Sequence, residues 1–333
     1  MSSADAVAPP ELVHVTRDGV VESVHRGHVA VVAIDGTVLA ALGNPGLPAY
    51  ARSALKPFQA LATLELLGEA GRTLDAVGLA IACASHEGSD EHQVEAARLL
   101  ADAGLDEEAL LCPAALPGDV ATLRRTPAPT RLAHNCSGKH ASFLAAQVAA
   151  GEDPAAYLDP NGRLQRRIAE RLAEVSGATP TGPGSDGCGA PAWILPLRAL
   201  ASAFARLAAG TGDLAPMAAA LRARPDLVGG TAAVDTALML GDARIVAKRG
   251  AEACFGAGAL RPDGSPIGIA VKIADGTGRA TGPVVGAVLR GLGFHVDDAL
   301  VRPDVLGGGL PHGVITAVPA VVEVATRLGQ PSG

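Results

Sequence analysis

The order of hydrophobic patterns along the chain restricts the possible folds more than any other feature. Residues 11–42 alternate apolar and polar side chains around a turn at Asp35-Gly36, which predicts an antiparallel hairpin. Strand-like runs recur late in the chain, at 244–248, 253–260 and 267–274. Between them the spacing is mostly helical. This order predicts an α+β fold, in which both chain ends form one antiparallel sheet and a helical region is inserted between them.

Apolar residues at three- and four-residue spacing predict the individual helices. These predictions cover 58–67, 90–103, 139–150, 161–175, 192–209, 216–223 and 283–292. The short apolar run 78–84 is predicted as a strand, and a last apolar stretch covers 314–325. Gly and Pro interrupt 112–138 and 179–191, so both segments are predicted as loops.

Length and composition favour a single compact unit. A chain of 333 residues can bury its own core, and this one has neither an internal repeat nor a low-complexity linker. We therefore expect one domain over 1–333, with 1–10 as a flexible N-terminal segment. Hydrophobic residues make up 48% of the chain but aromatic residues 2%, and 41 residues are glycine. The core should consist largely of Ala, Leu and Val.

The charge pattern excludes several kinds of partner. The formal net charge is -7 and no long run of Lys or Arg occurs, so we expect neither nucleic acid nor an anionic membrane as a partner. Residues 1–11 lack the pattern of a secretory leader, and no apolar run reaches membrane-spanning length. These features predict a cytoplasmic protein that acts on a small molecule. Its five cysteines are expected to be free thiols, metal ligands or core residues.

Lysine is unusually rare in this chain. Of the 27 basic residues, 23 are Arg and four are Lys, namely Lys56, Lys139, Lys248 and Lys272. An amine can lose its proton and act as a base or a metal ligand, whereas a guanidinium cannot. The four lysines are therefore the first candidates for chemistry.

Ser53 and Lys56 form a Ser-x-x-Lys pattern that is typical of some serine hydrolases. If a helix begins near Ser53, the amine three residues later lies on the same face as the hydroxyl. The helix N-terminus would also favour a developing oxyanion. To act as a base near neutral pH, Lys56 needs a lowered pKa, which requires burial or a second cation nearby. The alternative is an N-cap serine followed by a solvated lysine.

Two more groups carry polar side chains beside apolar segments. Lys272 lies in Val-Lys-Ile-Ala-Asp-Gly, an apolar strand pattern in which it is either a site residue or an edge-strand lysine. Cys-Ala-Ser-His-Glu-Gly, residues 83–88, contains Ser85 and His86. Ser85 can hydrogen-bond a substrate or Lys272. His86 either binds the substrate or makes a structural hydrogen bond.

The remaining two groups contain thiols. His-Asn-Cys-Ser-Gly-Lys-His, residues 134–140, places Cys136 and His140 four residues apart, as two metal ligands on one helix face can be. Ser-Asp-Gly-Cys-Gly-Ala-Pro, residues 185–191, contains Asp186 and Cys188. For each cysteine the alternative is a buried, inert core residue.

Taken together, these blocks resemble the rhizobial-type L-asparaginases. The resemblance covers nearly the whole chain and rests on five blocks in order: Arg-Ser-x-x-Lys-Pro, Cys-Ala-Ser-His-x-Gly, Asn-Cys-Ser-Gly-Lys-His, Asp-Gly-Cys-Gly-x-Pro and Val-Lys-Ile-x-Asp-Gly. It implies a fold similar to serine β-lactamases and glutaminases. It also implies a homodimer that hydrolyses L-asparagine to L-aspartate and ammonia.

The resemblance further assigns roles to individual residues. It implies two Ser–Lys tandems, a zinc ion held by two thiolates and an amine, and a polar substrate pocket. The tandems are Ser53 with Lys56 and Ser85 with Lys272; the zinc ligands are Cys136, Lys139 and Cys188; the substrate-binding residues are Arg52, His86, Asp186 and His140. Arg52 suits an α-carboxylate and Asp186 an α-ammonium group. Lys248, Cys83, Cys112 and Cys254 carry weaker claims.

The predicted reaction passes through an acyl-enzyme. Lys56, neutral beside Lys272, removes the proton from Ser53, whose oxygen attacks the side-chain amide. The zinc ion positions substrate or structure. Two other functions remain open: a penicillin-recognising hydrolase, although Lys272 is not followed by the usual Thr-Gly, and a catalytically silent zinc- or amino-acid-binding protein.

Overall fold

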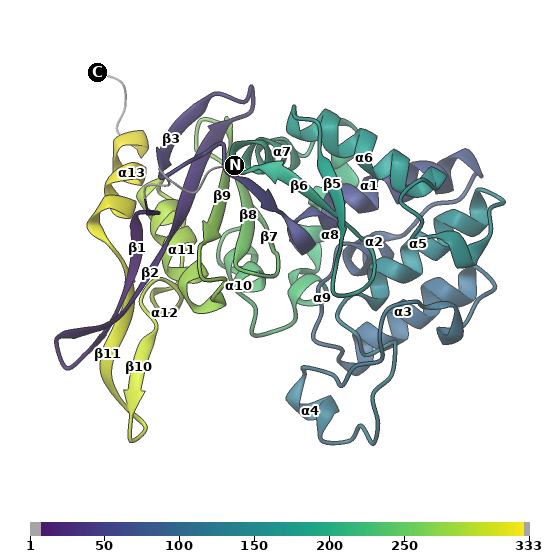
Figure 1. The fold of residues 1–333 in the computed structure, drawn as a ribbon, viewed down its shortest axis with the longest axis horizontal. Helices are drawn as coiled ribbons and strands as arrows, with labels where there is room; N and C mark the ends of the chain where they lie inside the picture. The colour runs from purple at the N-terminus through teal and green to yellow at the C-terminus, as the bar shows by residue number, and fades with distance from the viewer. Residues whose placement is uncertain (1–7, 330–333) are drawn as a thin grey trace.

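The computed structural model describes residues 8–329. An antiparallel sheet made from both ends of the chain forms one half of the molecule (Figure 1). Its strand order is β10-β11-β1-β2-β9-β8-β7, and β3 pairs with β2 at Val29 to Val32. The strands are β1 (Glu11–Arg17), β2 (Val20–Ala33), β3 (Val38–Leu42), β7 (Ile245–Arg249), β8 (Cys254–Leu260), β9 (Pro266–Ile273), β10 (Asp304–Gly307) and β11 (Leu310–Ala317). The predicted α+β arrangement with a shared antiparallel sheet is confirmed.

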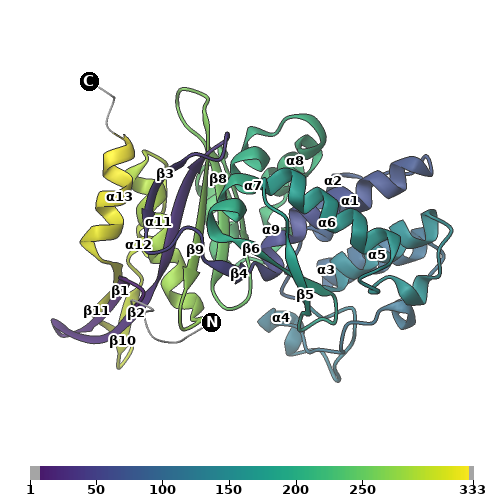
Figure 2. The ribbon, with the colours of Figure 1, turned by 45° about the horizontal axis from the view of Figure 1, so that its top comes forward.

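The middle of the chain forms the helical region that lies beside this sheet (Figure 2). Its helices are α1 (Lys56–Glu69), α2 (Ala76–Ala82), α3 (Asp90–Asp102), α4 (Val120–Leu123), α5 (Ser137–Ala149), α6 (Arg163–Ser176), α7 (Leu197–Ala209), α8 (Ala215–Ala223), α9 (Pro225–Gly229) and α10 (Val234–Gly241). A small second sheet contains β4 (Pro48–Tyr50), β6 (Pro191–Pro196) and β5 (Thr181–Ser185). After the last central strands follow α11 (Thr281–Gly291), α12 (Asp298–Val301) and α13 (Pro319–Gly329).

Helices lie on both sides of the large sheet. In both views α7 lies toward the helical region, whereas α11 and α13 lie on the far side (Figures 1 and 2). One hydrophobic cluster continues from the strands into α1, α5 and α7. Within residues 8–329 no helix is long and apolar enough to cross a membrane. Most of the predicted flexible segment 1–10 lies outside the described residues, and the single domain over 1–333 stays a prediction.

Three predicted elements are wrong in type or extent, and a fourth stretch, for which no type was predicted, contains two elements. The run 78–84 belongs mainly to α2 and not to a strand, because Asp75 caps this helix by accepting from the Gly78 N–H at 2.7 Å. A short, fully buried apolar run shows no period that separates strand from helix. The predicted loop 179–191 contains β5, and the helix predicted from 192 begins at Leu197, after β6. The stretch 314–325 divides between β11 and α13.

Glycines allow α7 to approach the sheet closely. A Cβ added at Gly268 of β9 would lie 1.8 Å from the Ala201 carbonyl oxygen, and one at Gly258 of β8 would lie 2.0 Å from the Phe204 carbonyl oxygen. Phe204 also packs edge-to-face against Phe58 of α1, with ring centroids 5.4 Å apart. This close packing fixes α1, and with it the start of the site, against the sheet.

Substitution of Gly268 by Ala should destabilise the protein strongly. The added methyl group meets α7 backbone, which cannot move like a side chain, so we expect the free energy of unfolding to fall by about 1–3 kcal/mol. Gly68 of α1 is the matched control, since nothing lies within 4 Å of an added Cβ and alanine favours helix by about 0.5–1 kcal/mol. Urea denaturation measures both variants. Equal stability of Gly268→Ala and Gly68→Ala would contradict this account of the packing.

Candidate active site

Ser53 and Lys56 lie where a short 3-10 helix, Arg52–Leu55, continues into α1. The backbone N–H of Lys56 donates to the Ser53 carbonyl oxygen, so the two residues are one tight turn apart. Arg52, directly before Ser53, has a φ of 52°, in the left-handed region that is rare for a residue with a side chain. Such strained residues are concentrated at active sites. Ser53 is half-buried, and Lys56 is 1% exposed.

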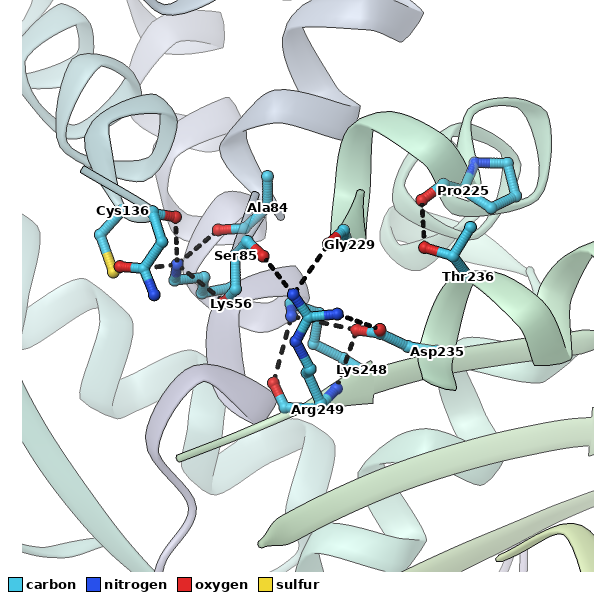
Figure 3. Close-up of polar contacts among 11 residues, drawn as sticks. Lys56, Ala84, Ser85, Cys136, Pro225, Gly229, Asp235, Thr236, Lys248 and Arg249 are labelled. Carbon is cyan, nitrogen blue, oxygen red and sulfur yellow. Dashed lines mark hydrogen bonds and ion pairs between the residues drawn. The ribbon is translucent and has the colours of Figure 1, made fainter. Parts of the chain in front are cut away.

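The Lys56 amine is the point at which several segments meet (Figure 3). It donates to Ser85 Oγ at 3.0 Å and to Cys136 Sγ at 3.1 Å, and it contacts the Ala84 carbonyl oxygen. In the described residues no hydrogen bond joins this amine to the Ser53 hydroxyl. The structure therefore brings Ser85 to Lys56, with Ser53 one turn away.

Lys272 lies elsewhere than predicted. Its amine donates to the Glu252 carbonyl oxygen at 2.7 Å and to its own strand at Ile273 O, 2.5 Å away. Glu252 and Ala253 have φ values of 56° and 49°, so Lys272 binds the strained turn between β7 and β8. No hydrogen bond between Lys272 and Ser85 is present within residues 8–329. The structure thus does not join the predicted pair by a hydrogen bond.

Lys248 of β7 is next to Arg249, which donates to the Ser85 carbonyl oxygen. It is fully buried, and its amine donates to Asp235 Oδ2 at 3.3 Å and to the Arg249 carbonyl oxygen at 3.1 Å. Burial lowers the pKa of Lys248 to about 7; the Asp235 charge opposes this shift, and the charges of Arg249 and Lys56 add to it. Sequence reasoning gave this residue little weight. The available signal was Lys-Arg-Gly at a strand end, which is similar to the Lys-Thr-Gly strand motif of penicillin-recognising enzymes.

Two thiols and a third lysine form a cluster on the other side of Lys56. Lys139 Nζ lies 3.1 Å from Cys188 Sγ, and both groups are buried. A hydrogen bond with Cys188 holds the pKa of Cys136 well below its usual range, and the Lys56 and Lys139 charges overcome the opposing effect of burial. Burial also opposes a charge on Lys139, but Cys188 and Cys136 raise its pKa overall. The predicted zinc ligands are therefore brought together.

His140 follows Lys139 on α5 and is fully buried. Its Nδ1 lies 2.6 Å from the Tyr157 hydroxyl, and its Nε2 has no hydrogen-bond partner. Burial lowers the pKa of His140 to about 4, and the nearby Cys188 thiol opposes this shift. A neutral imidazole thus directs an unpartnered nitrogen toward the thiol cluster.

The donor set fits a zinc ion. Thiolates bind zinc well, and a buried, unpartnered nitrogen beside them is suited to an additional contact. Within residues 8–329, no group of three or more His, Cys, Asp or Glu side chains is arranged to hold a metal. The fit therefore requires Lys139 as the third donor, and its amine must release a proton when the metal binds.

Arg52 and Asp186, predicted as two substrate contacts, pair with each other. Arg52 Nε and Nη2 donate to Asp186 Oδ1 at 3.0 and 2.6 Å. Burial alone would raise the pKa of Asp186, but the hydrogen bond from Arg52 and the charges of Lys139 and Arg52 lower it overall. The described residues leave Arg52 Nη1 and Asp186 Oδ2 without a hydrogen bond, so the pair offers one donor and one acceptor side by side.

His86 is occupied by the protein itself. Its Nδ1 accepts from the Gly88 N–H at 3.1 Å, and its Nε2 lies 3.0 Å from Ser137 Oγ. The ring also stacks on His92, with centroids 4.8 Å apart. Both nitrogens are thus engaged by structural hydrogen bonds, and the role of His86 as a substrate contact stays a prediction.

Comparison of the sequence with known protein families identifies the family of this chain. The model of the family described as L-asparaginase II matches residues 13–315. The chain belongs to the L-asparaginase II family, the rhizobial-type asparaginases. No curated protein matches the sequence. This confirms the resemblance on which the residue roles were predicted.

Solved structures similar to this L-asparaginase II chain are distant. They include Mglu in its native form in 4.3 M NaCl, at 15% identity and a TM-score of 0.45, and Mglu in its glutamate form, at 15% identity and a TM-score of 0.43. Each alignment covers 82% of this chain and 62% of Mglu. The chain thus spans less than two thirds of the Mglu chain that it matches.

Replacement of Lys248 by Met should change how stability depends on pH. Folded Lys248 has a pKa of about 7, whereas an unfolded lysine has about 10.4. Between these values the unfolded chain binds more protons, so this group makes the free energy of unfolding rise with pH. Wild type should gain stability relative to Lys248→Met from about pH 7 to about pH 10, measured by urea denaturation. A difference that stays constant over this range would contradict a lowered pKa.

Proposed function

We propose that this protein is an L-asparagine amidohydrolase that forms L-aspartate and ammonia. The observation that supports the proposal most is the buried Lys56 amine, 3.0 Å from Ser85 Oγ and one turn beyond Ser53, in a chain of the L-asparaginase II family. A buried amine that contacts one serine hydroxyl and follows a second serine by one turn is suited to moving protons during acyl transfer.

In the proposed reaction Ser53 is the nucleophile, because it is half-buried and reachable, whereas Ser85 is 4% exposed. The Lys56 amine accepts the Ser53 proton as the serine oxygen bonds to the side-chain amide carbon. Ser85 receives this proton from Lys56 and passes it to the departing nitrogen, so that the carbon–nitrogen bond breaks and ammonia leaves. Water then attacks the aspartyl ester, Lys56 takes the water proton, and Ser53 regains its hydrogen.

Lys248, in place of Lys272, is the proposed lysine of the second tandem, and it reaches Ser85 through its neighbour Arg249, since no hydrogen bond joins the Lys248 and Ser85 side chains within residues 8–329. The neighbouring Arg249 donates to the Ser85 carbonyl oxygen at 2.9 Å, which fixes β7 to the Ser85 main chain. A neutral Lys248 can accept a proton from this part of the site, whereas a charged one cannot. The reaction should therefore require deprotonated Lys248.

Arg52 and Asp186 would hold the two charged groups of the amino acid. Arg52 Nη1 suits the α-carboxylate, and Asp186 Oδ2 suits the α-ammonium group. Their mutual ion pair orients both side chains before substrate arrives. His140 would support the adjoining thiol cluster and the substrate through its unpartnered Nε2.

Zinc belongs to the same proposal, with Cys136, Lys139 and Cys188 as its ligands. When bound, the ion would supply a positive charge beside the substrate pocket that orients anionic substrate groups. Because Cys136 also contacts Lys56, the thiol cluster and the catalytic amine are positioned together. A fold like that of serine β-lactamases and glutaminases, a homodimer and a cytoplasmic location complete the proposal.

Replacement of Ser53 by Ala should lower ammonia release from L-asparagine by about 10³-fold or more, because the proposed reaction loses its nucleophilic oxygen. Ser85→Ala should lower it by about 10²–10⁴-fold, the usual contribution of proton transfer. Coupled ammonia detection with asparagine and glutamine measures both variants. Ser142 is the control, since its hydroxyl is buried and donates to the Lys139 carbonyl oxygen, so Ser142→Ala should keep the active-site chemistry.

Activity of Ser53→Ala near the wild-type level would overturn Ser53 as the nucleophile. Hydrolysis of nitrocefin without release of ammonia from asparagine would favour the penicillin-recognising function. Asparagine binding without turnover by the wild type would favour a silent binding protein.

Metal content tests the zinc ligands separately. Purified wild type should contain about one zinc per chain, and Cys188→Ala should contain much less, because a thiolate ligand is lost. Cys254→Ala is the control, since burial raises the pKa of that thiol to about 12 and no partner thiol adjoins it in the described residues. Elemental analysis after dialysis gives the result. Equal zinc in both variants would exclude the proposed ligand set.

A further inference from the structure

A buried carboxylate lies behind the two proposed Ser–Lys tandems. Asp235, in the first turn of α10, is 0% exposed. Its Oδ1 accepts from Arg249 Nη1 at 2.8 Å, and its Oδ2 accepts from the Arg249 backbone N–H at 3.1 Å and from Lys248 Nζ at 3.3 Å (Figure 3). One acidic side chain therefore fixes two consecutive residues of β7.

Arg249 extends this network to Ser85. Its Nη2 donates to the Ser85 carbonyl oxygen at 2.9 Å and to the Gly229 carbonyl oxygen at 2.8 Å. The Ser85 N–H donates in turn to the Val228 carbonyl oxygen at 2.8 Å. The main chain of Ser85 is thus held from β7 and from α9, which determines where its hydroxyl meets Lys56.

The network also contains more basic than acidic side chains. Asp235 is shared between Lys248 and Arg249, and a guanidinium keeps its proton. The groups that face Lys248 are Asp235 from α10, Arg249 from β7 itself, Lys56 from α1, and Cys83 and His86 from the segment that ends α2 and follows it. Asp235 is the carboxylate among them, so it favours the charged form of Lys248 against every cation nearby.

We propose that Asp235 is a positioning residue for amide hydrolysis, which aligns Ser85 through Arg249 and controls the charge of Lys248. This inference rests on the proposed function. Asp235 does not reach the substrate pocket, because its carboxylate is fully buried and bound by β7. It acts through the residues that it holds.

The test is Asp235→Asn in the full chain, with ammonia release from L-asparagine as the readout. The amide keeps the shape but loses the charge, so kcat should fall by about 10–100-fold while KM changes by less than about twofold. The acidic limb of the kcat/KM profile should move to lower pH by about one unit or more, since a lost negative charge disfavours protonated Lys248. A purely structural role would not move this limb.

Asp242 provides the matched control. It follows the same helix at its other end and pairs with Arg244, outside the network around Ser85. Asp242→Asn should keep both kcat and the pH profile within about twofold and a few tenths of a unit of wild type.

The variant Arg249→Lys distinguishes the alignment of Ser85 from the charge of Lys248. It also tests the inference if Asp235→Asn does not fold. Lysine keeps the positive charge but cannot form the fork to Asp235, Ser85 and Gly229, so kcat should fall about 10-fold or more without the shift in pH. Wild-type kcat in Arg249→Lys, or wild-type kcat and pH profile in a folded Asp235→Asn, would overturn the inference alone. Absence of ammonia release by the wild type would overturn the proposed function and this inference with it.

Discussion

The burial of the Lys56 amine is the constraint on which the rest of the site depends. An ammonium or amine taken out of water must receive hydrogen-bond partners, and here they come from the segment that follows α2 and from the start of α5. Lys56 therefore joins three parts of the helical region at one atom. The packing of α7 on the sheet glycines and of Phe204 on Phe58 holds α1 in position for this contact. The core packing and the site geometry thus depend on the same position of α1.

The charges around this amine are organised in two layers. On one side the thiol cluster of Cys136, Cys188 and Lys139 balances thiolate against ammonium in a buried space. On the other side Asp235 binds Lys248 and Arg249, and the guanidinium continues to the Ser85 main chain. Buried charges of this kind cost free energy unless each one is paired, so both layers are expected to tolerate substitution poorly. Their common neighbour is Lys56.

Much of the fold follows from local patterns in the sequence. The strands within 11–42 and the three late strands are visible because each alternates or stays apolar over a strand length, and together they define the shared sheet. The predicted single hairpin is incomplete, since 11–42 contains β1, β2 and β3 and turns at Asp18-Gly19 as well as at Asp35-Gly36. The run 78–84 is different, because a fully buried segment carries no periodic signal and its cap, Asp75, lies outside the run. The strand β6 was not predicted because it leads directly into α7, so that its residues were included in the predicted helix and loop.

The site was predicted more completely in its residues than in its pairings. The rarity of lysine indicated four candidates, Lys56, Lys139, Lys248 and Lys272. Lys248 and Lys272 both lie in apolar strands, and a strand pattern alone does not show which of the two faces the catalytic serines. That depends on tertiary packing: a Cβ at Gly250 would lie 2.6 Å from the Ala51 carbonyl oxygen, so the end of β7 lies against the segment before Ser53. Lys272 lies on β9, two strands further into the sheet, and binds the β7–β8 turn instead.

The nucleophile is the central claim, and a trapped intermediate tests it most directly. Wild-type enzyme mixed with L-asparagine and quenched in acid within milliseconds should carry an aspartyl ester, which peptide mass spectrometry locates. The account predicts the added group on the peptide and side chain of Ser53. An aspartyl ester on Ser85, with Ser53 unmodified, would contradict it.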